Sequence, residues 1–189
     1  MHKLPCFYIL SNFKEHEKLK EKVLKEINNS KVSSLVKDND YYTDNINRVD
    51  WSQCTNFKRP WVQYLLQPLM AHIETEFNDI GYLTTMVYQI WFQQYFKEGT
   101  HGWHIHGHNF TGVYYLDFDQ SSPKTELVYP YKNNEKISIN ANEGDIVIFP
   151  SFVIHRGPKV LNDRTKTIIS FNFSLKEIAK EKMKELNEL

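Results

Sequence analysis

The half of the chain between residues 82 and 173 most constrains the fold, because it consists of short strand-like runs separated by turn signals. Aromatic residues make up 14% of the chain, and such residues suit the half-buried surface of a pleated sheet. Many short strands at this spacing are typical of an antiparallel sandwich or barrel. We therefore predict a mostly β domain that has an aromatic-rich segment at 86–96 and short strands within 113–118, 126–131, 136–139, 145–149 and 167–173.

Three segments outside this half have helical periodicity. The apolar residues of 61–77 fall on one stripe behind Pro60, a residue favoured at the first helical position. Asn12 with Glu15, and Ser174 with Glu177, have the spacing of a capping box at the start of the other two segments. The predicted organisation is a single domain with a helical N-terminal buttress 1–80, a jelly-roll core 82–174 and a C-terminal helix 175–189.

Charge and cysteine content exclude several classes of protein. The chain has 23 basic and 23 acidic residues, so no net field attracts nucleic acid. No apolar run is long enough for a signal peptide or a membrane span. Cys6 and Cys54 form no recognisable framework, which favours a reducing, cytoplasmic location. The polar stretch 37–45 is predicted to be a surface loop, with a mobile lid as the alternative.

A histidine cluster is the strongest chemical signal. Four of the eight histidines, His101, His104, His106 and His108, fall within one octet. Residues two apart on a strand share a face, so His104 and His106, or His106 and His108, can present their imidazoles together. Imidazole is the commonest protein ligand for Fe, Zn, Cu and Ni, although histidines also serve as hydrogen-bonding strand residues. His155 follows a buried strand and is the best candidate for a third ligand, whereas three other histidines look peripheral, namely His2, His16 and His72.

Two cations lie at the start of the last predicted strand. Arg164 and Lys166 are two residues apart and can face the same side. A cation that points into a barrel can bind the carboxylate of a small acid, whereas solvated charges at the strand entrance are the alternative. A metal site nearby favours the first interpretation for one of the two.

These elements, in this order, resemble the 2-oxoglutarate- and Fe(II)-dependent oxygenases that are related to prolyl hydroxylases and common in marine bacteria and their phages. The resemblance covers about residues 88 to 174, or half of the chain. It rests on five spaced elements, which are His104-x-His106, segment 111–116, segment 144–151, His155 and a basic residue before 168–172.

The resemblance implies a double-stranded β-helix (jelly roll, cupin-like) in which His104, His106 and His155 hold Fe(II). It implies conversion of 2-oxoglutarate and O2 to succinate and CO2, with hydroxylation of an unidentified substrate. Lys166 matches the position that usually holds an arginine contacting the distal carboxylate of 2-oxoglutarate, and Arg164 is the alternative. No catalytic residue is predicted beyond the metal ligands, and further pocket candidates are Asn109, Tyr88, Gln93 and Tyr114, with Trp103 either lining the substrate mouth or packing.

The sequence departs from the family at His106, where related enzymes have aspartate or glutamate. His108 is therefore kept as the alternative ligand. Two rival functions follow: a three-histidine metal dioxygenase that does not use 2-oxoglutarate, and a non-catalytic jelly-roll binding module. A nucleic-acid demethylase is disfavoured by the zero net charge. The substrate stays open between a prolyl residue, a free amino acid, a nucleobase and a lipid-like molecule, and the oligomeric state is not predicted.

Overall fold

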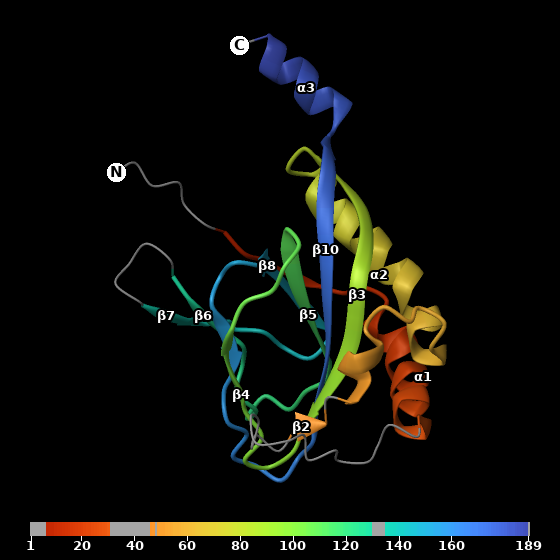
Figure 1. The fold of residues 1–189 in the computed structure, drawn as a ribbon, viewed down its shortest axis with the longest axis vertical. Coiled ribbons are helices and arrows are strands. Elements are labelled where there is room, and N and C mark those ends of the chain that lie inside the picture. The colour runs from red at the N-terminus through yellow and green to blue at the C-terminus, as the bar shows by residue number, and fades with distance from the viewer. Residues whose placement is uncertain (1–6, 31–45, 48, 130–134, 189) are drawn as a thin grey trace.

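The computed structural model describes residues 7–30, 46–47, 49–129 and 135–188. Two antiparallel sheets curl into a half-barrel of the jelly-roll type, as the sequence predicts, and three α-helices accompany them in the described part (Figure 1). The six-stranded sheet has the order β1-β8-β5-β10-β3-β2, and the four-stranded sheet has the order β4-β9-β6-β7.

The large sheet is built around two long strands, β3 (Tyr82–Tyr95) and β10 (Lys166–Ile178). They pair along nearly their whole length, and β5 (Phe110–Asp117) pairs with the other edge of β10. Both faces of β10 are buried from Lys166 to Phe173, although four of these eight residues are polar, namely Lys166, Thr167, Ser170 and Asn172. The sheet is completed by β8 (Asp145–Pro150), β1 (Ile9–Asn12) and β2 (Ile46–Asn47).

The small sheet has much shorter strands. It consists of β4 (His101–His104), β9 (His155–Gly157), β6 (Glu126–Val128) and β7 (Lys136–Ser138). The pairing of β4 with β9 is irregular, with a register shift between His101 and His104. This sheet faces the large one across a second apolar cluster that includes Tyr115, Val147, Phe149 and Ile168.

Helices cover the outer face of the large sheet (Figure 1). These are α1 (His16–Asn29) and α2 (Pro60–Asn78), and a 3-10 helix, Val49–Gln53, precedes α2. Buried residues of both α-helices pack with outward-facing residues of the sheet into one large core cluster. The prediction of a helix behind Pro60 is confirmed, because Pro60 occupies its first turn.

The predicted start of the first helix is wrong. Asn12 is the last residue of β1, and its side-chain amide donates to the Asp145 carboxylate over 3.2 Å instead of capping a helix. The helix begins at His16, and its N-cap residue, Glu15, makes no side-chain cap bond. The N-terminal region is therefore not only a helical buttress, since it also adds β1 and β2 to the large sheet.

The predicted start of the C-terminal helix is also wrong. Ser174 and Glu177 lie inside β10, because pairing with β3 continues as far as Ile178. Helix α3 (Lys180–Asn187) follows, none of its residues is buried, and it projects from the body (Figure 1). The polar stretch 37–45 lies outside the described residues, as does Cys6, whereas Cys54 is a buried thiol. Among the described residues, the helices are all too short or too polar to cross a membrane.

Candidate metal centre

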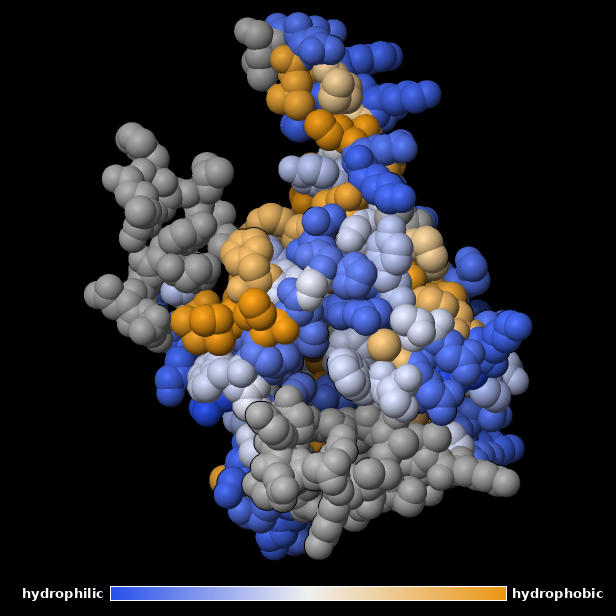
Figure 2. All heavy atoms as spheres, in the orientation of Figure 1, coloured by the Kyte–Doolittle hydropathy of each residue, from blue (hydrophilic) through white to orange (hydrophobic). Residues whose placement is uncertain are grey.

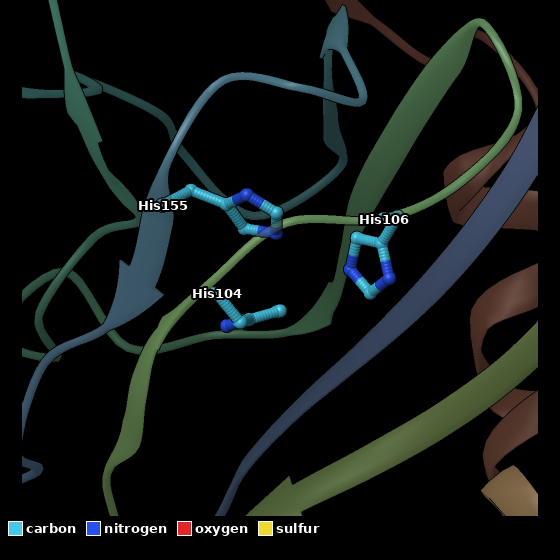
Figure 3. A group of neighbouring side chains, drawn as sticks. All are labelled: His104, His106 and His155. Carbon is cyan, nitrogen blue, oxygen red and sulfur yellow. The ribbon is translucent and has the colours of Figure 1, made fainter.

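Three histidine rings converge between the two sheets (Figure 3). One ring nitrogen from each of His104, His106 and His155 lies within 4.8 Å of the other two. The ring centroids of His104 and His155 are 4.2 Å apart, and His106 lies 4.9 Å and 5.0 Å from them. Three imidazoles at this separation can ligate one ion.

Strand pairing brings two of these histidines together. In the β4–β9 pair, His104 lies directly opposite His155, and residues opposite one another in an antiparallel pair project on the same side. His155 is only 4% exposed, so its ring is held inside the barrel. The large sequence separation between the two is thus bridged by a single cross-strand contact.

The same two rings have their tautomers fixed by backbone carbonyls. His104 Nδ1 lies 2.7 Å from the Gly102 carbonyl oxygen, and His155 Nδ1 lies 2.9 Å from the Val153 carbonyl oxygen. A carbonyl only accepts, so Nδ1 must carry the proton in both rings. The lone pair is then on Nε2, which is how histidines are commonly oriented toward a metal.

Burial keeps the His106 and His155 rings uncharged. Desolvation, with the neighbouring His104 and His108, lowers the pKa of His106 to about 4. Desolvation and the same His104 lower the pKa of His155 to about 3. Both imidazoles are therefore neutral near pH 7, which is the form that binds metal. The three imidazoles, the tautomers of His104 and His155 and the neutral charge of His106 and His155 fit a divalent transition-metal ion.

His106 is held differently, and His108 does not join the cluster. His106 lies on the loop after β4, and its backbone N–H donates to the Ser151 carbonyl over 3.0 Å. His108 has a φ of 65° and stacks on Tyr88, with 5.0 Å between ring centroids. The structure therefore groups His106, rather than the alternative His108, with His104 and His155.

Lys166 lies in the same pocket as the three histidines. It is 1% exposed, and its Nζ donates to the Pro123 carbonyl over 2.7 Å, beside the rings of Tyr95 and Phe118. Burial lowers the pKa of Lys166 to about 7. A buried lysine that has no carboxylate partner among the described residues is costly when charged, so an anion entering the pocket would be strongly attracted.

Of the other predicted pocket residues, only Gln93 lines this pocket. Its Oε1 accepts a bond from the Ser170 hydroxyl, and its Nε2 lies 3.3 Å from His101 Nδ1. Arg164 precedes β10 and is exposed, with its guanidinium bound to Asp119 over 2.9 Å. The pair of cations two residues apart therefore does not share a face, because regular strand begins only at Lys166.

Asn109, Tyr88 and Tyr114 lie elsewhere. The Asn109 side-chain oxygen accepts a hydrogen bond from the Leu175 N–H at the exposed end of β10. The Tyr88 ring stacks on the His108 ring. Tyr114 points to the opposite face of the large sheet, where its hydroxyl lies 2.6 Å from His16 Nδ1. His16 is thus a buried core residue at 5% exposure and not a peripheral histidine.

Several pocket residues were not identified from the sequence. The Tyr115 hydroxyl donates to Thr125 over 2.7 Å, and Thr125 lines the pocket with Lys166. Trp91 is also in the lining, and His101 stacks on His104 with 4.0 Å between centroids. Strand alternation from Lys166 would have found Ile168 and Ser170, but the residues on neighbouring strands depend on the register.

Side chains that alternate with the histidines point outward and leave an apolar patch on the small sheet. The exposed fractions of Trp103, Ile105, Phe152 and Ile154 are 41%, 57%, 60% and 46%. Orange atoms gather beside β6 in Figure 2, on a face that is otherwise mostly hydrophilic. The Arg156 guanidinium covers the Trp103 ring at 4.5 Å and also binds Glu126. Trp103 therefore packs outside the barrel and does not line the pocket.

Comparison with known proteins shows the fold. No family model matches the sequence, and no curated protein resembles it closely enough to match. Among solved structures, a prolyl-4-hydroxylase from Pseudomonas putida has a TM-score of 0.56 at 12% identity, over 89% of this chain and 87% of that one. A prolyl hydroxylase from Trichoplax adhaerens, in complex with a hypoxia inducible factor peptide fragment, has a TM-score of 0.61 at 16% identity, over 95% and 86%. AviO1 from Streptomyces viridochromogenes Tue57 has a TM-score of 0.58 at 12% identity, over 89% and 90%.

Proposed function

We propose that this chain is an oxygenase that depends on Fe(II) and 2-oxoglutarate and hydroxylates a substrate within the pocket between its two sheets. The observation that carries the proposal is the presence in one pocket of three converging imidazoles and a buried lysine. The fold shared with the prolyl hydroxylases supports it.

His104, His106 and His155 would be the three protein ligands of Fe(II), each through a neutral ring. When bound, the iron and its co-substrate supply the oxidation, in which 2-oxoglutarate and O2 become succinate and CO2. The Lys166 ammonium would receive the distal carboxylate through a charge-assisted hydrogen bond. Burial of Lys166 at 1% exposure excludes water from this bond and so strengthens it.

A second candidate function follows from the composition of the cluster. All three grouped residues are histidines, and no carboxylate joins them among the described residues. Such a neutral donor set is also compatible with a metal dioxygenase that activates its substrate directly and needs no 2-oxoglutarate. Lys166 favours the first function, because this buried amine has no carboxylate partner among the described residues and could receive one from 2-oxoglutarate.

Anaerobic titration of the purified protein with Fe(II) and then 2-oxoglutarate tests the proposal. A visible metal-to-ligand charge-transfer band should appear only when both are present, and His106→Ala should abolish it. Exposure to O2 should then release succinate. Iron binding with no band and no succinate would favour the three-histidine dioxygenase, whereas no iron binding would favour the non-catalytic binding module.

A further inference from the structure

A row of hydrogen-bonded polar side chains, three of them buried and Gln89 half-buried, crosses the large sheet on the pocket face. Asn172 lies opposite Gln89 on one side and opposite Thr111 on the other. The Thr111 hydroxyl donates to the Asn172 Oδ1 over 2.8 Å, and the Asn172 amide donates to the Gln89 Oε1 over 2.8 Å. At the other end, the Thr111 hydroxyl lies 2.9 Å from the Ser151 hydroxyl. The row therefore links β3, β10 and β5 to the residue that follows β8.

The hydrogen bonds of this network all donate in one direction, from Ser151 toward Gln89. A hydroxyl has one proton, and that of Thr111 is used on Asn172, so Ser151 must be the donor toward Thr111. Ser151, Thr111 and Asn172 are 0%, 1% and 1% exposed. An unpaired polar group at such depth is destabilising, so the network holds Ser151 in one place.

Ser151 in turn holds the loop that carries His106. Its backbone N–H donates to the Asn109 carbonyl over 2.9 Å, and its carbonyl accepts from the His106 N–H over 3.0 Å. Both ends of the segment 106–109 are thus hydrogen-bonded to the backbone of Ser151. Within the segment, His108 has a left-handed conformation. Within the described part of the chain, the His106 ring makes no hydrogen bond of its own, unlike the rings of His104 and His155.

We propose that the network of Gln89, Asn172, Thr111 and Ser151 is the positioning device for His106, the third metal ligand. This inference rests on the proposed function. His104 and His155 are oriented through their rings, whereas His106 is oriented through its backbone, by a serine that the large sheet fixes. None of the four network residues needs to touch the metal. They act through the loop, so their loss should loosen one ligand and leave the other two in place.

Thr111→Val and Ser151→Ala break the network at two points, and Tyr114→Phe is the matched control. Tyr114 lies on the same strand as Thr111 and loses a buried hydroxyl, but on the opposite face of the sheet. In metal-free protein, hydrogen exchange at the His106 amide should become at least about tenfold faster in the first two variants and stay unchanged in the control. Thr111→Ser, which keeps the hydroxyl, should restore the wild-type rate.

Co(II) binding, followed by its d–d absorption, is the second measurement. Thr111→Val and Ser151→Ala should weaken Co(II) binding by about tenfold or more and alter the spectrum, whereas Tyr114→Phe should do neither. In a His106→Ala background, Thr111→Val should cause no further loss, because the ligand through which it acts is gone.

Equal losses from Thr111→Val with and without His106 would overturn the positioning role, as would an unchanged His106 exchange rate. Wild-type protein that binds neither Co(II) nor Fe(II) would contradict the proposed function instead. The exchange measurement in metal-free protein would still decide whether the network positions His106.

Discussion

The two sheets of this molecule differ in length, regularity and content. In the large sheet, β3 and β10 run for 14 and 13 residues, and helices α1 and α2 bury its outer face. In the small sheet, β4 and β9 have four and three residues with a register shift between them, yet they carry His104 and His155. The region with the most buried apolar surface is therefore not the region that carries these two clustered histidines.

This difference suggests that the large sheet mainly provides stability and the small sheet mainly positions the site. The hydrophobic contribution to stability scales with buried apolar area, which is concentrated on the large sheet and its helices. The small sheet contributes two of the three proposed metal ligands, and its short irregular pairing suits strands that must present side chains at particular points. Mutations in the two regions should therefore change different measurable quantities.

The largest effect on stability is expected from Phe171→Ala. The Phe171 ring is fully buried and lies directly over Gly112, so closely that a Cβ at the glycine position would lie 2.0 Å from the ring Cζ. Removing the ring should lower the free energy of unfolding by about 4 kcal/mol, because it would leave a cavity in the core between the large sheet and its helices. Chemical denaturation measures this loss. Co(II) affinity of the folded fraction should stay close to wild type. A parallel loss of affinity would contradict the idea that stability and metal binding depend on different sheets.

The converse variant, His155→Ala, should leave most of the stability and remove metal binding. Loss of one of three ligands should weaken Fe(II) or Co(II) binding by on the order of a hundredfold or more. The free energy of unfolding of the metal-free protein should change far less than in Phe171→Ala. Isothermal titration and denaturation on the same preparation compare the two. If metal-free His155→Ala does not fold, the small sheet is also required for stability, and the expected difference between the two sheets is wrong.

Lys166 connects the two regions, because it begins β10 and points into the pocket of the histidines. Lys166→Met keeps most of its length but removes the charge. It should weaken 2-oxoglutarate binding to the iron-loaded protein by on the order of a hundredfold, the worth of a buried charge-assisted bond. Fe(II) affinity should not change. Arg164→Met is the control, since Arg164 is exposed and bound to Asp119, and a comparable loss there would reassign the carboxylate site.

A smaller effect is expected from pH. The pKa of Lys166 is lowered to about 7 in the free protein, so the ammonium that binds a carboxylate is depleted as the pH rises above 7. Affinity for 2-oxoglutarate should level off below pH 7 and fall by up to about tenfold per unit above it, until the raised pKa of the complex is reached. Binding measured between about pH 6 and pH 9 should show this slope in wild type. The same slope in Lys166→Met would assign it to another group.

The sequence predicted much of this arrangement, for reasons that are local. Strand periodicity and turns identified β5, β8 and β10, and the two-residue spacing of His104 and His106 indicated the cluster. The errors came from tertiary pairing. Capping-box spacing at Ser174 could not reveal that β3 continues beside it, so the end of a strand was mistaken for the start of a helix.

The residues of the site also depend on tertiary pairing that the sequence does not reveal. Alternation alone separates Thr111 from Tyr114 on β5, but only the sheet tells which face holds the pocket. Asn109 and Tyr88 lie near the histidines in sequence or in space and still point elsewhere. Lys166 was identified because its strand position matched a family pattern, whereas its neighbours Tyr115 and Thr125 come from segments whose approach depends on the long-range fold.

The tether of Lys166 has a consequence for ligand size. Its Nζ is held at the Pro123 carbonyl among aromatic rings, and two of the three histidines, His104 and His155, are held opposite each other by the pairing of β4 with β9. In the proposed binding mode, a ligand of another length would have to displace one of these two ends. The pocket would therefore select ligands by carbon-chain length as well as by charge. Dicarboxylic keto acids one methylene shorter or longer than 2-oxoglutarate would reach either Lys166 or the metal held by the histidines, but not both.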